Sequence, residues 1–82
     1  MLSTYPNPFD TQTTISFRLM DDTNMGIYIY SYRGELLDVI EQAFYPKGEY
    51  QYNWDAAAQP AGIYFVRILA GEEHFSFKLV KR

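Results

Sequence analysis

The chain has 82 residues, a formal net charge of −3 and no cysteine. This length allows one domain, and the lack of cysteine excludes disulfides, thiolate metal sites and cysteine nucleophiles. The acidic balance argues against a nucleic-acid-binding protein, because such proteins usually carry a basic face that neutralises phosphates.

The first distinctive stretch is YPNPF, residues 5–9. Pro6 and Pro8 each fix φ and disfavour helical geometry at the preceding residue, so Tyr5 and Asn7 are held extended. We expect a rigid joint in which Phe9 closes one end of the fold. The joint can mark a boundary with a preceding segment that a peptidase reaches, or it can protect a sheet edge, and the two roles are compatible.

Alternation with period two dominates the rest of the chain, and no window of eleven residues carries a helical apolar stripe. The alternation predicts six strands, at residues 13–19, 25–30, 36–42, 49–54, 63–69 and 75–80. The third is the short one, and the fifth is apolar on both faces apart from Arg67, which predicts a central strand. Gly34 is expected to hold the positive φ of a tight turn. Residues 55–62 are expected to form a loop, since Pro60 would stop a helix.

Six strands joined by short turns predict a small antiparallel Greek-key β-sandwich of immunoglobulin-like type, with six to seven strands. Eight tyrosines, six phenylalanines and one tryptophan supply its core. We expect Trp54 to be a core anchor.

Residues suited to catalysis or metal binding are few. His74 is the only histidine and lies in a predicted turn, where a solvated role is expected. Asp21, Asp22 and Asn24 could contribute to a calcium site, but they lack the ligand ladder and final glutamate of an EF-hand loop, and solvated turn charges are the simpler interpretation. The sequence predicts neither an enzyme nor a cofactor.

Tyr28, Tyr30 and Tyr32 share one side of the second strand. An exposed tyrosine row would suit a carbohydrate or a protein partner, because aromatic faces stack on sugar rings. Alternatively, these side chains cover the edge of a thin core.

Six stretches together resemble, in their order and spacing, the C-terminal sorting domain of type IX secretion cargo proteins. The stretches are YPNPF, TTISFRL, IYSYRGELL, GEYQYNWD, PAGIYFVRI and KLVKR, and they extend over nearly the whole chain. The resemblance implies a non-catalytic secretion signal that the type IX outer-membrane translocon recognises and that a sortase-like peptidase removes. It also implies a Bacteroidetes-type bacterium, transit through the periplasm, and delivery to the cell surface or the medium.

The resemblance places partner recognition at particular positions. These are Asn7, Pro8, Phe9, Gly34, Gly62, Tyr64 and Lys78, and the basic C-terminus adds Lys81 and Arg82, which can steer the domain toward an acidic receptor. The family commonly has an aspartate shortly before the turn glycine, where this chain has Ser31, Tyr32 and Arg33, so no acidic role is carried over.

Residues 1–82 are therefore expected to be a single C-terminal sorting domain of a larger secreted protein, with cargo domains preceding it in the same chain. No nucleic-acid partner is expected. No apolar run reaches the ~20 residues of a transmembrane helix, and the N-terminus lacks the pattern of a signal peptide. A carbohydrate-binding module and a structural immunoglobulin-like spacer of a cell-surface protein are the alternatives.

Overall fold

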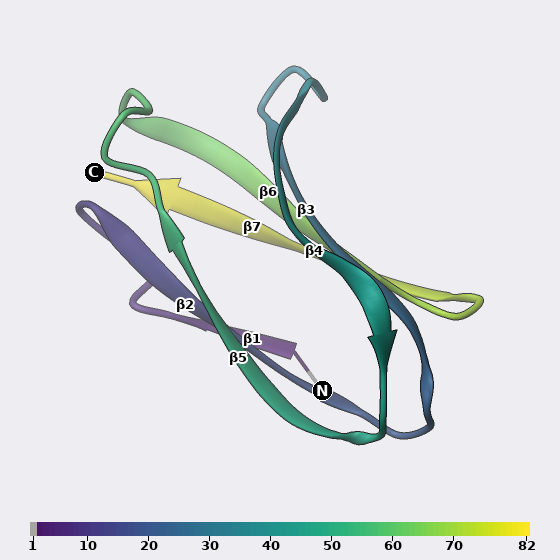
Figure 1. Cartoon of the computed structure of the whole chain (residues 1–82). Coiled ribbons are helices and arrows are strands. Elements are labelled where there is room, and N and C mark those ends of the chain that lie inside the picture. Colours follow the sequence, from purple (N-terminus) through teal and green to yellow (C-terminus); the bar gives the residue numbers. More distant parts are fainter. Residues whose placement is uncertain (1) are drawn as a thin grey trace.

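A computed structural model describes residues 2–82, which form seven strands and no helix (Figure 1). The strands are β1 (Leu2–Tyr5), β2 (Gln12–Leu19), β3 (Thr23–Ser31), β4 (Leu36–Tyr45), β5 (Gly48–Asp55), β6 (Gly62–Ala70) and β7 (Glu73–Lys81). They build two antiparallel sheets with the orders β1-β2-β5 and β4-β3-β6-β7. The chain changes sheet after β2, β4 and β5, as Greek-key immunoglobulin-like sandwiches do, so the predicted fold class is confirmed. Nothing in residues 2–82 has the length and apolarity of a membrane-crossing helix.

The core is built from the inward-facing side chains of both sheets, as the alternation predicts. The buried apolar residues are Phe9, Ile15, Phe17, Leu19, Met25, Ile27, Ile29, Trp54, Ala56, Tyr64, Val66, Ile68 and Leu79. Within the β1-β2-β5 sheet, Phe17 of β2 stacks on Tyr50 and Tyr52 of β5 with ring centroids 5.7 and 6.0 Å away. The predicted central strand, β6, lies between β3 and β7.

Two strands differ from the sequence prediction. β1 precedes the YPNPF stretch and pairs with β2 from Leu2↔Phe17 to Tyr5↔Thr14; its four residues are too few for alternation alone to reveal a strand. The third predicted strand is not short, because β4 continues to Tyr45 and has ten residues. The missed residues, 43–45, pair regularly with β3 but directly precede Pro46, Lys47 and Gly48, whose turn signal led to an earlier predicted end.

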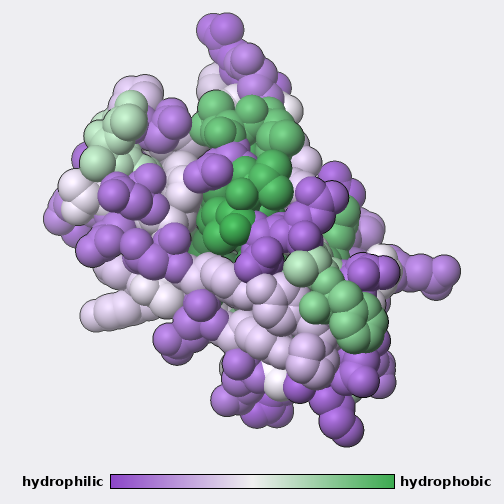
Figure 2. Space-filling view, in the orientation of Figure 1, coloured by the Kyte–Doolittle hydropathy of each residue, from purple (hydrophilic) through white to green (hydrophobic). Residues whose placement is uncertain are grey.

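β4 presents an apolar free edge. Its neighbour in the sheet is β3 alone, and its exposed apolar side chains are Leu36, Leu37, Val39 and Phe44. β4 and β5 form the near side of the molecule in Figure 1, and Figure 2 shows hydrophobic surface crossing the middle of that side. Free apolar strand edges of this kind can accept a further strand.

The sandwich has two contrasting ends. The motif end contains the YPNPF stretch, the β3–β4 turn, the β5–β6 loop and the C-terminus (Figure 1). The acidic end contains the β2–β3 turn and the β6–β7 turn, with the carboxylates of Asp21, Asp22, Glu72 and Glu73.

Candidate functional site

The N-terminal motif lies against the edge of β7 at the motif end. The side-chain amide of Asn7 donates from Nδ2 to the carbonyl oxygen of Lys78 at 2.8 Å, and its Oδ1 accepts from the backbone N–H of Val80 at 3.0 Å. The same Nδ2 donates to the hydroxyl of Thr4 at 3.1 Å. One amide side chain thus satisfies two backbone groups that β7 would otherwise leave open at its edge.

Phe9 continues this contact through its backbone. Its N–H donates to the carbonyl of Val80 at 2.9 Å, its carbonyl accepts from the N–H of Arg82 at 2.8 Å, and it forms a parallel bridge with Lys81. The two ends of the chain are therefore joined by four hydrogen bonds. The motif covers a sheet edge, which is one of the two roles expected for it.

The Phe9 side chain plugs the motif end, where it is fully buried. Its ring meets Trp54 edge-on with centroids 5.9 Å apart, and Trp54 meets Tyr64 edge-on at 5.4 Å. Trp54 is 3% exposed, so the predicted core anchor is confirmed. Burial of three aromatic rings against one another gives this end of the fold a large share of its apolar stabilisation.

Tyr64 forms a tyrosine corner. It lies near the start of β6, and its hydroxyl donates to the carbonyl of Pro60, four residues upstream in the β5–β6 loop. This arrangement is a recurrent feature of immunoglobulin-like sandwiches at the turn between the equivalent strands. The buried hydroxyl is thereby satisfied and fixes the loop.

Two further contacts tie the loops of the motif end together. The ammonium of Lys81 donates to the carbonyls of Ala56 and Gln59, at 2.6 Å to Ala56. Thr13, which is buried, donates its hydroxyl to the carbonyl of Pro6 at 2.6 Å. These bonds link the last strand to the β5–β6 loop, and β2 to the N-terminal motif.

The β3–β4 turn is organised by Ser31. Its hydroxyl oxygen accepts the backbone N–H groups of Arg33 and Glu35, both at 3.1 Å, and its backbone bonds close the same turn. Gly34 has φ of 86°, a conformation that favours glycine, as predicted. Ser31 thus supplies through a hydroxyl the kind of side-chain acceptor that an aspartate offers in turns.

The model of the secretion system C-terminal sorting domain family matches residues 3–82. The chain belongs to this family. The family is that of type IX secretion sorting tails, so the domain is a type IX secretion C-terminal sorting signal, which implies export to the cell surface or the extracellular space. It also implies interaction with the type IX machinery and with a cargo N-terminal to the domain, and domains of this family are generally non-catalytic. A search of curated proteins finds none that matches the chain.

The sorting domain uses many of the sequence-predicted site residues internally. Phe9 and Tyr64 are buried, Asn7 and Lys81 bond to backbone groups, and Gly62, like Gly34, adopts a positive φ, here 153°. No Cβ clash explains either glycine, so the backbone conformation itself is what favours it.

Four predicted site residues keep side chains that are exposed at the motif end, namely Asn7, Pro8, Lys78 and Arg82, and among these Asn7 bonds to the backbone of β7. Nε of Arg82 lies 3.4 Å from Oδ1 of Asp10, and both of these side chains are mostly exposed. The sequence did not predict the hydrogen bonds made by the hydroxyls of Ser31 and Thr13, or those accepted by the carbonyls of the β5–β6 loop. Of these, only Ser31 carries a local signal, a serine three residues before a turn glycine.

The remaining candidates lie elsewhere on the sorting domain. His74 is exposed and pairs with Leu69 in the β6–β7 hairpin. In the described part of the chain, residues 2–82, no three His, Cys, Asp or Glu side chains are grouped for a metal ion. Tyr28 and Tyr30 are half-buried, whereas Tyr32 lies beyond the end of β3 in the turn and is 73% exposed.

One titratable contact has a clear physical effect. The hydroxyl of Tyr45 donates to Oε2 of Glu41 at 2.6 Å, and the N–H of Gln42 donates to Oε1 at 3.1 Å. These bonds lower the pKa of Glu41, with the bond from Tyr45 as the largest cause, and the same bond raises the pKa of Tyr45. The pair lies at the end of β4, away from the motif end.

Proposed function

We propose that this domain is the last module of a larger secreted protein and that the type IX outer-membrane translocon recognises it as a folded unit. In this proposal the protein crosses the periplasm before it meets the translocon. A sortase-like peptidase then cuts in the segment before the domain and removes it. Family membership supports the sorting role.

The observation that carries recognition as a folded unit is the pairing of the two ends of the chain. Asn7 and Phe9 bond to the backbone of residues 78–82, so the YPNPF and KLVKR stretches come together only when the sandwich is formed. A receptor that contacts both stretches would discriminate against unfolded tails.

The exposed residues of the motif end are the proposed contact surface. Lys78 and Arg82 present cations on an otherwise acidic domain, and Pro8 lies in the stretch that covers β7. Cations at one end of a domain steer it toward an acidic receptor surface, with an effect that salt screens. Strand addition along the apolar edge of β4 is the second contact mode.

The test is a fusion of residues 1–82 to the C-terminus of a fluorescent reporter that is directed to the periplasm. It is expressed in a host with a type IX system and in a translocon-deficient mutant of the same host. We expect reporter at the surface or in the medium of the first host alone. A folded fusion that stays in the periplasm of both hosts would refute the proposal.

The alternative of a carbohydrate-binding module rests on the outer face of the β4-β3-β6-β7 sheet. There Tyr30 pairs with Phe65 and Tyr28 with Arg67, so aromatic and cationic groups lie side by side. Glycan-array binding that a Tyr30→Ala variant loses would favour this function. A structural spacer would instead be favoured if deletion of the domain shortened a surface assembly and left export intact.

A further inference from the structure

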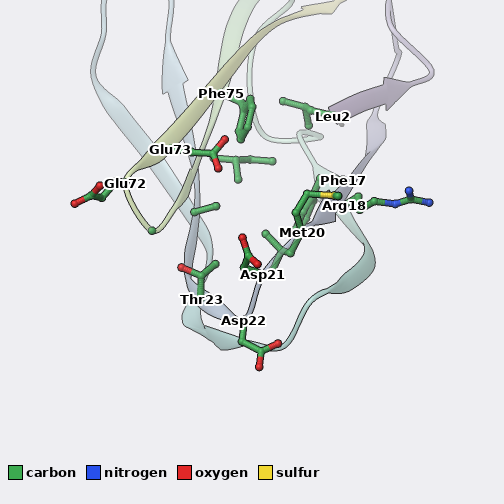
Figure 3. Close-up of a pocket in the computed structure, with 14 residues that line it drawn as sticks. Leu2, Phe17, Arg18, Met20, Asp21, Asp22, Thr23, Glu72, Glu73 and Phe75 are labelled. Atoms are coloured by element: carbon green, nitrogen blue, oxygen red, sulfur yellow. The ribbon is translucent and has the colours of Figure 1, made fainter.

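A cavity of about 490 Å³ lies between the two sheets at the acidic end of the sandwich (Figure 3). Its floor is apolar and comes from both sheets, with Phe17 and Leu19 on β2, Ile68 on β6 and Phe75 on β7. Leu2 of β1 forms one side. The volume is within the range of about 300–1,000 Å³ that is usual for ligand pockets.

Within residues 2–82, β2 extends two residues further toward the cavity than β1 does. The pairing of β1 with β2 begins at Leu2↔Phe17, so Arg18 and Leu19 pair only with β5 within the described residues. In the described part of the chain the inner side of β7 is not covered there, and Phe75 is 42% exposed. An apolar floor is therefore accessible from solvent.

The mouth of the cavity is strongly negative. Four of its lining residues are acidic, namely Asp21, Asp22, Glu72 and Glu73. The ion pairs among residues 2–82 are Arg18 with Glu49 and Arg82 with Asp10, and neither includes these four carboxylates.

The orientation of the side chains leaves the negative charge uncompensated. Arg18 is the only cation that lines the cavity, and its guanidinium binds Glu49 on the side away from the space (Figure 3). Asp22 accepts the backbone N–H of Lys47 at 2.9 Å. In Figure 3 Asp21 and Glu73 point toward the cavity, whereas Asp22 and Glu72 point away from it, so the first two carboxylates are the ones that face its interior.

We propose that this cavity docks an extended segment of a partner protein in which a large apolar side chain is flanked by lysine or arginine. The apolar side chain would bury the apolar floor of the cavity, and the flanking cations would pair with the carboxylates at the mouth. An acidic segment is repelled by the same carboxylates. The cavity lies at the other end of the sandwich from the YPNPF and KLVKR stretches, so this docking is separate from the sorting function proposed above.

The test uses the purified 82-residue domain, isotope-labelled for amide NMR, and three peptides. The probe is Gly-Lys-Arg-Leu-Phe-Lys-Arg-Gly, one control replaces its cations with Glu and Asp, and the other replaces Leu-Phe with Ser-Ser. We expect the probe alone to shift the amides of Met20, Gly71 and Phe75. Raising the salt from about 50 to about 500 mM should weaken the binding.

Matched variants locate the charge effect. Asp21→Asn with Glu73→Gln removes two charges from the cavity, whereas Glu35→Gln with Asp38→Asn removes two charges near the β3–β4 turn. We expect the first pair to weaken probe binding by roughly five- to tenfold, as partly exposed ion pairs do, and the second pair to leave it unchanged. Unchanged amide spectra away from the substitutions will show that both variants fold.

Several outcomes would overturn the proposal. They are no binding at millimolar probe, equal binding of either control peptide, or an equal loss in the Glu35→Gln, Asp38→Asn variant. Concentration-dependent shifts of the same amides without peptide would assign the cavity to a second copy of the chain. Loss of binding when a reporter precedes residue 1 would assign it to the preceding segment, and either result contradicts a partner-protein occupant.

Discussion

The side-chain amide of Asn7 takes the place of a peptide group at the edge of β7. The sequence predicts an extended asparagine between two prolines; in the structure Asn7 lies in a bend, and its side chain bonds to β7. Its partners could not be predicted, because Lys78 and Val80 are 71 and 73 positions away and no local pattern indicates which strand the motif meets.

Replacement of Asn7 by alanine should weaken this joint. The Asn7→Ala variant loses both bonds to β7, and we expect the free energy of unfolding to fall by about 1–2 kcal/mol. The control is Asn53→Ala, which loses one exposed bond to Gln12 and should change stability by no more than about 0.5 kcal/mol. Urea unfolding followed by tryptophan fluorescence measures both, and equal effects would contradict a special role for Asn7.

A substitution at Tyr64 tests how much the tyrosine corner contributes to stability. Tyr64→Phe keeps the buried ring against Trp54 but removes the bond to the carbonyl of Pro60. The expected loss is about 1 kcal/mol, which corresponds to a fall in Tm of roughly 4–8 °C for a domain of this size. Thermal unfolding by circular dichroism measures it. An unchanged Tm would mean that the hydroxyl does not stabilise the β5–β6 loop.

Glu41 should make stability depend on pH. Since its pKa is lower in the folded state, the folded state favours the carboxylate, and the resulting stability is present above the ordinary glutamate pKa of about 4.3. It is lost as the pH falls through the lowered value. Urea midpoints from pH 7 to pH 3 should therefore fall less steeply for Glu41→Gln than for the wild type. Tyr45→Phe, which removes the donor, should lie between them, and three parallel curves would exclude this pair as a source of pH dependence.

At the scale of elements, the prediction succeeds where alternation is long and unbroken. β2, β5, β6 and β7 appear close to their predicted bounds because each is a β-prone run bounded by turn-forming residues. β1 is too short to show a period, and the last residues of β4 stand directly before Pro46, Lys47 and Gly48, where the turn signal outweighs the strand pattern. The sequence also gives no sign that β4 ends as an apolar free edge, since that depends on which strands become neighbours.

The basic end of β7 is the element on which export should depend. We expect Lys78→Ala with Arg82→Ala to reduce surface delivery of the reporter severalfold, with stability changed by no more than about 0.5 kcal/mol, because both side chains are exposed. Val39→Lys with Phe44→Lys provides the comparison, since charges on an edge strand discourage strand addition. If the first variant were delivered normally and the second lost surface delivery, the receptor contact would lie at β4 and not at the motif end.

For the whole molecule, the sequence predicts the fold class and the family. It does not predict which motif residues are buried or hydrogen-bonded inside the fold. Pattern and resemblance locate residues such as Phe9, Gly62 and Lys81. They do not reveal that Phe9 and Lys81 lie together where the two ends of the chain meet, because that requires the three-dimensional pairing of β7 with the N-terminal motif. The residues whose side chains stay exposed to a receptor, such as Lys78 and Arg82, are identified only once the internal contacts are known.

The central claim is that the type IX machinery reads this tail as a folded unit, and a core variant tests it most directly. Ile27→Ala with Ile68→Ala alters two fully buried, paired residues and leaves every motif residue in place. The expected loss of roughly 4–10 kcal/mol is comparable to the whole stability of a small domain. The measurement is the fraction of reporter at the surface, with total reporter fluorescence as the control for degradation. We predict that the variant stays in the cell, and delivery at the wild-type level would show that the tail is read as linear motifs.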